Sequence, residues 1–183
     1  MVGALPDNSR PLRRAEYEQL VALGAFGDER IELLDGVLVP MSPIGTRHAS
    51  AVDLLTVILI RALGDRARVR VQGPFAVSDI SEPEPDLLVA PMDDYVTDHP
   101  TEAYLVIEVA DSTLAKDRTT KLCIYAEHGV PEYWIVDVTT RRLCVYRDPS
   151  ADGFKSSRVF EHHEAVELLR FPDVRVNVAD VLK

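Results

Sequence analysis

The segment AYLVIEVAD, residues 103–111, constrains the fold of this chain more than any other feature. Its Leu, Val and Ile residues are typical of a strand that is buried on both faces, so other layers must cover it. Glu108 lies inside this apolar run. A carboxylate among apolar neighbours costs free energy unless another group compensates it. The sequence therefore predicts a specific partner for Glu108.

Three segments have the composition and end signals of helices: residues 10–24, 42–64 and 112–129. In the second, Thr46 is the expected N-cap and Gly64 the expected end. The third is expected to begin at Ser112 or Thr113 and to end at Gly129.

Strand patterns occupy much of the remaining chain. The Asp35-Gly36 pair predicts a hairpin within residues 30–41. The other expected strands are 68–77 (interrupted at Gly73-Pro74), 86–91, 103–111, 132–138, 141–148, one or two within 155–168, and one within 171–183 before a final helical turn. This order favours an α/β or α+β fold, with a mixed central sheet flanked by helices.

Net charge, apolar run length and cysteine content exclude several classes of protein. A formal net charge of −10 argues against a protein that coats nucleic acid through bulk electrostatics. The densest basic stretch, Arg61 to Arg70, is interpreted as a solvated helix end and strand. No apolar run reaches the length of a membrane span, and the N-terminus lacks the order of a secretory signal. Cys123 and Cys144 are expected to be reduced thiols of a cytoplasmic protein.

A second acidic residue stands beside an apolar run, in PEPDLLVAP, where Asp86 opens the expected strand. If this strand neighbours the one that carries Glu108, both carboxylates reach a common point. Two close carboxylates repel each other unless a cation lies between them or one is protonated. A hard ion such as Mg2+ could bind both, together with the backbone carbonyl of Val109. On this interpretation Asp86→Asn would not destabilise the metal-free protein.

The helix after the Glu108 strand carries Asp117, Lys121 and Tyr125 at i, i+4 and i+8, so they share one face. By spacing alone, an ordinary Asp117–Lys121 helical ion pair is the favoured explanation of the first two. The order of strand and helix favours a role of Lys121 in a functional site, because the helix must fold back over the sheet beside Glu108.

These motifs together resemble the Uma family of putative restriction endonucleases, which belongs to the PD-(D/E)XK nuclease superfamily. The resemblance runs from RIELLDGVLVPMSP through EYWIVD, and includes Pro85-Asp86, IEV at Glu108 and ADSTLAKDRTTKLCIYAEHGVPEYWIVD. One departure concerns the lysine of the signature, because Ala110 occupies its usual place. Lys121 resembles the migrated lysine of several branches of this superfamily.

The resemblance implies roles for individual residues. Asp86 and Glu108 would ligate Mg2+ or Mn2+, and Lys121 would orient or activate the attacking water. Glu32 would be a further acidic member, although a surface position before the hairpin is an equal alternative. His48 would approach the site or contact phosphate, against the commoner structural role of a lone histidine. Asp117 would hold Lys121 in place.

The resemblance also implies the organisation of the chain. Residues 1–183 would form one restriction-endonuclease-like domain: an N-terminal helix and hairpin at about 10–42, a catalytic core at about 43–148, and C-terminal strands at 149–183. Tyr125 and Trp134 are expected in the core.

The expected function is metal-dependent endonuclease cleavage of DNA by a homodimer. The alternatives are an inactive binding or assembly module with the same fold, and a hydrolase of small phosphate esters.

Overall fold

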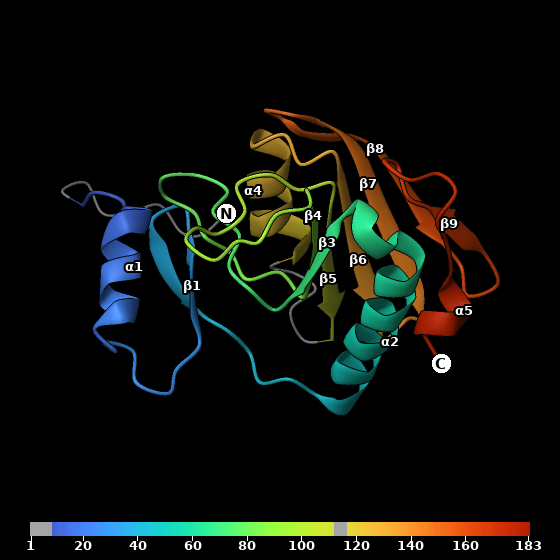
Figure 1. The fold of residues 1–183 in the computed structure, drawn as a ribbon, viewed down its shortest axis with the longest axis horizontal. Coiled ribbons are helices and arrows are strands. Elements are labelled where there is room, and N and C mark those ends of the chain that lie inside the picture. The colour runs from blue at the N-terminus through green and yellow to red at the C-terminus, as the bar shows by residue number, and fades with distance from the viewer. Residues whose placement is uncertain (1–8, 112–116) are drawn as a thin grey trace.

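The computed structural model describes residues 9–111 and 117–183 and confirms the mixed architecture (Figure 1). A six-stranded sheet has the order β3-β4-β5-β6-β7-β8, and two short two-stranded sheets accompany it. The first half of the chain forms α1 (Arg14–Ala22), β1 (Ile31–Leu34), β2 (Val37–Pro40), α2 (Thr46–Leu63), η1 (Gly64–Arg66), β3 (Arg68–Val71), β4 (Leu87–Ala90) and β5 (Leu105–Ala110). The second half forms η2 (Asp117–Lys121), α4 (Leu122–Glu127), β6 (Glu132–Asp137), β7 (Arg142–Ser150), β8 (Gly153–Phe160), β9 (Ala165–Glu167), β10 (Arg175–Asn177) and α5 (Val178–Val181).

Within the six-stranded sheet, β5 and β6 are the parallel pair and the other neighbours are antiparallel. Parallel strands need a crossover, and the segment containing η2 and α4 provides it. The carboxyl ends of β5 and β6 therefore lie at the same edge. Because β4 is antiparallel to β5, the start of β4 lies at this edge too.

Strand alternation sends the side chains of β5 into two separate cores. Leu105, Ile107 and Val109 belong to the core that α2 covers. Val106 and Ala110 belong to the other core, which contains Tyr125 of α4. Figure 1 shows α2 and α4 as the helices of these two layers. Glu108 shares the parity of Val106, so its side chain is expected on the α4 side.

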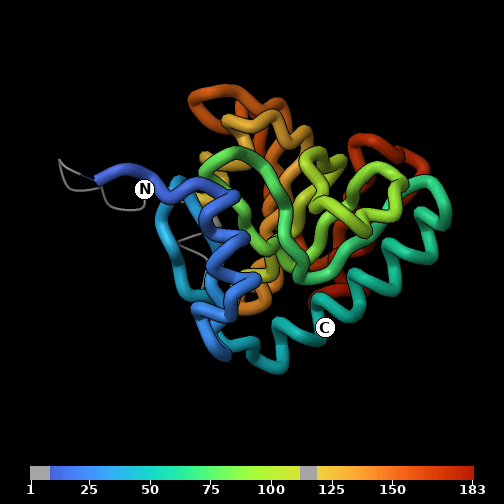
Figure 2. Tube along the Cα trace, turned by 60° about the vertical axis from the view of Figure 1, so that its left-hand side comes forward, coloured from blue at the N-terminus to red at the C-terminus, as the bar shows by residue number. Residues whose placement is uncertain are grey.

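Helix α1 and the β1–β2 hairpin lie to one side of the main sheet (Figure 2). The buried Tyr17 of α1 donates a hydrogen bond to the Ile31 carbonyl of β1 over 2.6 Å. Leu33 and Glu82 exchange backbone hydrogen bonds of 3.4 and 2.8 Å, which fixes the hairpin beside the segment that leads into β4. Gly36 is required at the hairpin turn, because it has φ 74° and a Cβ there would meet Pro11.

Several predicted boundaries need correction. Gly45, and not Thr46, is the N-cap of α2, which ends at Gly64 as predicted. The strand expected at 68–77 ends at Val71, because Gln72 has φ 47° and leaves the extended conformation. The helix expected at 112–129 is π-helical at Asp117–Lys121 before α4, and its expected start lies outside the described residues.

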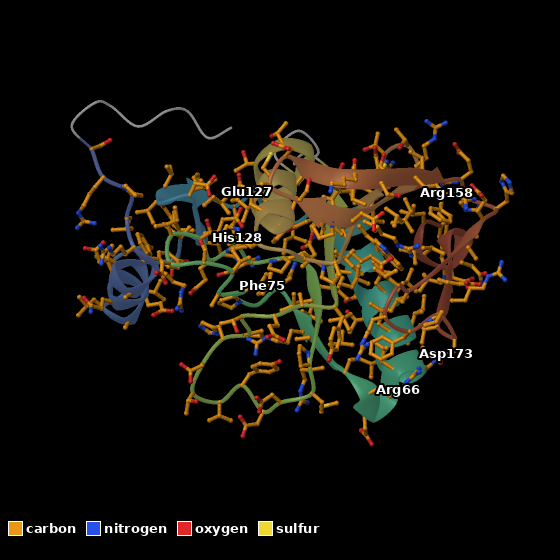
Figure 3. All side chains as sticks on the ribbon, turned by 90° about the horizontal axis from the view of Figure 1, so that it is seen from above. Arg66, Phe75, Glu127, His128, Arg158 and Asp173 are labelled. Carbon is orange, nitrogen blue, oxygen red and sulfur yellow. The ribbon has the colours of Figure 1, made fainter. Side chains whose placement is uncertain are left out.

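The C-terminal segment packs against α2 and contributes buried side chains to the core that this helix covers. Figure 3 labels Arg66 and Asp173, whose 2.7 Å ion pair joins η1 to this segment. None of the helices in the described part of the chain is long and apolar enough to cross a membrane.

Glu82 is a buried acid at the junction of α1 with the main body. Its side chain lies near Glu18 and 3.8 Å from the Arg14 guanidinium. Burial, followed by the hydrogen bond and charge of Glu18, raises the pKa of Glu82 to about 7. The folded protein therefore holds this proton more tightly than the unfolded chain does, and the contribution to stability falls as pH rises from about 4.5 to about 7.

We expect Glu82→Gln to increase the free energy of unfolding at pH 8 by about 1 kcal/mol, after allowance for solvent screening. It should have little effect at pH 4.5, where the wild-type carboxyl is already protonated. Urea titrations at both pH values test this. Glu127→Gln, at an exposed position labelled in Figure 3, is the matched control. Equal stability changes at the two pH values would contradict the prediction.

Candidate active site

Asp86 lies immediately before β4, and its carboxylate lies within hydrogen-bond distance of three donor groups. Its Oδ2 accepts a 2.8 Å hydrogen bond from the Val109 N–H of β5. Its Oδ1 lies 2.8 Å from His48 Nε2 and 3.3 Å from Gln72 Nε2. The register that pairs Leu87 with Ile107 places Asp86 opposite Glu108 when it is extended by one residue.

Glu108 lies in the middle of β5 and is only 4% exposed. Its Oε1 accepts two hydrogen bonds of 2.9 Å, one from Lys121 Nζ and one from the Tyr125 hydroxyl. Lys121 ends η2, and Tyr125 follows one turn later in α4. The shared helix face predicted for this pair therefore points at Glu108.

Glu32 of β1 is completely buried, which excludes the surface position that its sequence context allowed. Its Oε2 lies 3.0 Å from Lys121 Nζ and accepts a 3.3 Å hydrogen bond from the Glu84 N–H. The Lys121 ammonium thus lies between carboxylates from two separate sheets, one on β1 and one on β5.

The contacts explain how Asp86 stays ionised. Burial raises the pKa of Asp86, but the hydrogen bond and charge of His48, with the Val109 N–H and Gln72, outweigh it and hold the pKa below the ordinary value of 3.8. An ionised carboxylate only accepts hydrogen bonds, so Nε2 of His48 is the donor. Burial and the charge of Glu108 raise the pKa of Tyr125 well above 10, so its hydroxyl keeps the proton that it donates.

The structure brings together five predicted residues around one small cavity, namely Glu32, His48, Asp86, Glu108 and Lys121. The cavity has a volume of about 40 Å³, which suits an ion or a few waters. The catalytic and ligand roles of these residues stay predictions. The Asp117 side chain, expected to hold Lys121, lies outside the described residues.

The oxygen atoms around the cavity can be compared with the ligands that a metal ion needs. Within the described residues, no group of three or more His, Cys, Asp or Glu side chains is arranged to hold a metal. Asp86 and Glu108 still offer two carboxylates, and Val109 adds a carbonyl at the same strand edge. Mg2+ commonly binds through one or two carboxylates and completes its shell with water and phosphate oxygens. The residues present therefore fit Mg2+ or Mn2+ better than an ion that needs an all-protein cage.

Two polar contacts were not predicted. Tyr125 was assigned to the core, and it is fully buried, but its hydroxyl also holds Glu108. In the sequence, the four-residue spacing between Lys121 and Tyr125 was the feature that could have indicated this contact. Gln72 contacts Asp86 only because the chain turns at φ 47°. No periodic pattern marks such a turn. Trp134 is buried in the core, as predicted.

Comparisons with other proteins identify the family of this chain and a solved structure with a similar fold. The sequence profile of a family described as "Putative restriction endonuclease", Uma2, matches residues 14–179. The chain belongs to the Uma2 family. The crystal structure of a "putative nuclease belonging to DUF820" from Anabaena variabilis ATCC 29413 is similar, with a TM-score of 0.76 and 16% identity over 94% of this chain and 98% of that one. At this identity the similarity establishes the fold alone. No curated protein matches the sequence.

The hydrogen bonds to Asp86 revise the expectation that Asp86→Asn is harmless without metal. An asparagine cannot accept hydrogen bonds from all of these donors, so we expect a loss of about 1–2 kcal/mol in EDTA. The stabilising contribution of Asp86 is present above the unfolded pKa and is lost as pH falls through its lower folded pKa. The variant should therefore lose stability at pH 7 and less at acidic pH.

Urea titrations in EDTA test this, with Asp53→Asn on the exposed face of α2 as control. Wild-type stability of Asp86→Asn at pH 7 would show that these hydrogen bonds contribute nothing.

Proposed function

We propose that the protein is a metal-dependent endonuclease that hydrolyses DNA phosphodiester bonds. The convergence of Asp86, Glu108 and Lys121 around one cavity carries this proposal. Membership of a restriction endonuclease family supports it.

In this proposal Asp86 and Glu108 would hold Mg2+ or Mn2+, and the Val109 carbonyl would offer a third oxygen. When bound, the ion would lower the pKa of a bound water and stabilise the charge that develops on the phosphate. His48 and Gln72 orient the Asp86 carboxylate, and Tyr125 orients Glu108.

Lys121 has the role of the migrated lysine. Its ammonium lies 2.9 Å from Glu108 Oε1 and 3.0 Å from Glu32 Oε2, so the two carboxylates fix its position. From there it can hydrogen-bond to the attacking water or offset charge on a phosphate oxygen. Glu32 acts through Lys121 and is a positioning residue.

A plasmid-nicking assay with Mg2+ or Mn2+ tests the proposal. Wild-type protein should nick the plasmid and lose this activity in EDTA, and Asp86→Ala should reduce it at least 100-fold. Lys155→Ala, at an exposed position on β8, is the control for purification. Metal-independent cleavage, or no cleavage by folded wild-type protein, would reject the proposed function in favour of a non-catalytic module.

Lys121 needs a separate test, because removing it leaves two buried carboxylates without their shared cation and can destabilise the fold. Lys121→Arg keeps the charge, and we expect it to remain folded but to lose at least 10-fold in cleavage rate, since a planar guanidinium does not replace a compact ammonium. Circular dichroism melts establish folding. Wild-type turnover by folded Lys121→Arg or Lys121→Ala would contradict the role of Lys121.

We further propose that the active form is a homodimer, because a duplex has two strands to cut and two-fold pairing is the commonest oligomeric arrangement. Sedimentation at tens of micromolar should give twice the monomer mass of 20.4 kDa. A monomer under these conditions would reject this arrangement.

A further inference from the structure

A second cavity, of about 200 Å³, shares no lining residue with the cavity around Asp86. It lies where the first turn of α2, the β6–β7 turn and the C-terminal segment meet. Arg47, Arg141 and Lys183 contribute basic side chains from these three parts of the chain, and Thr46 and Ser50 contribute hydroxyls. Figure 1 shows the C-terminal end of the drawn chain beside α2.

The basic side chains of this cavity are not neutralised by neighbours. Among residues 9–111 and 117–183, no carboxylate forms an ion pair with Arg47, Arg141 or Lys183. Elsewhere in the described chain some basic residues form ion pairs and others, such as Arg61 and Lys155, form none; those with acidic partners include Arg10, Arg14, Arg30, Arg66, Arg142, Arg147 and Arg158. The distinguishing feature of this cavity is that two arginines that form no ion pair with the described residues, Arg47 and Arg141, line it together from separate parts of the chain, which in a chain with a net charge of −10 favours an anionic ligand.

Two acids near the cavity do not cancel this charge. Asp137 accepts hydrogen bonds of 3.0 and 2.9 Å from the Thr139 and Thr140 N–H groups, so its carboxylate is engaged within the β6–β7 turn. Asp111 lies near Gly45, at the start of α2. Neither forms an ion pair with the basic residues that line the cavity.

The position of the cavity links it to the candidate active site. Arg47 and His48 are consecutive in the first turn of α2, and His48 contacts Asp86. The Val138 N–H donates to the Ala110 carbonyl over 3.1 Å, so the ends of β5 and β6 are joined beside the cavity. Both cavities therefore lie at the edge of the sheet where β5 and β6 end and β4 begins.

We propose that this cavity binds a backbone phosphate of the nucleic-acid strand whose reacting phosphodiester lies at Asp86 and Glu108. The inference rests on the proposed function, and adds a positioning site for the substrate. Arginine guanidinium groups suit phosphate oxygens because they can donate two parallel hydrogen bonds. Contacts of this kind fix the register of the strand and are independent of its sequence.

The test is DNA binding without catalysis. Fluorescence anisotropy with a labelled duplex, in EDTA over a range of salt concentrations, compares wild type with the double variant Arg47→Gln/Arg141→Gln. We expect the double variant to bind more weakly, and the slope of log K against log salt to fall in magnitude by about 1, the value of one lost phosphate contact. Arg61→Gln is the matched control, because Arg61 is an exposed arginine on the same helix, outside the cavity.

Equal slopes for wild type and the double variant, or no measurable binding by wild type at low salt, would overturn the proposal. Inorganic phosphate gives the second arm. If it raises the melting temperature of wild type but not of the double variant, while DNA binding is unchanged, the site binds free phosphate and the nucleic-acid assignment is overturned. Loss of slope in the double variant together with an absence of plasmid nicking would support this site and reject only the proposed hydrolysis.

Discussion

The arrangement of the site depends on the two ion pairs that the Lys121 ammonium forms with Glu32 and Glu108. The ammonium lies within 3.0 Å of a carboxylate on β1 and 2.9 Å of a carboxylate on β5, and all three side chains are at least 95% buried. Removing one partner of a buried ion pair leaves an uncompensated charge, which costs far more than an exposed pair contributes. The hairpin, the central sheet and the crossover helix are therefore coupled through one cation.

This coupling explains why elements outside the main sheet matter to the site. Glu32 reaches Lys121 only because β1 is held beside the segment before β4 by the Leu33–Glu82 backbone hydrogen bonds. Helix α1 in turn holds β1 through Tyr17. A change at the α1 junction can therefore alter the position of Lys121 without contacting it.

The sequence predicted the fold class and the main strands because apolar runs and turn residues are local signals. It also predicted that Asp86 and Glu108 lie on neighbouring strands, since both acids stand in runs that must be buried. It named Lys121, His48 and Glu32 as members of the site, but it could not predict the contact that each of them makes. His48 and Gln72 reach Asp86 from α2 and from an irregular turn, and Glu32 reaches Lys121 from a separate hairpin. Such contacts depend on the packing of elements that are distant in the chain.

The ionisable side chains of the site leave it with an excess of negative charge. Glu32, Asp86 and Glu108 carry three negative charges when ionised, and Lys121 supplies one positive charge, so a formal charge of −2 remains, or of −1 when His48 is protonated as well. Asp86 stays ionised because its hydrogen bonds outweigh its burial. A divalent cation would cancel this charge and reduce the repulsion that an acidic protein exerts on a phosphodiester. The same balance explains why basic residues on the neighbouring cavity would be useful: they would attract the strand at a point where the carboxylates of the site cannot.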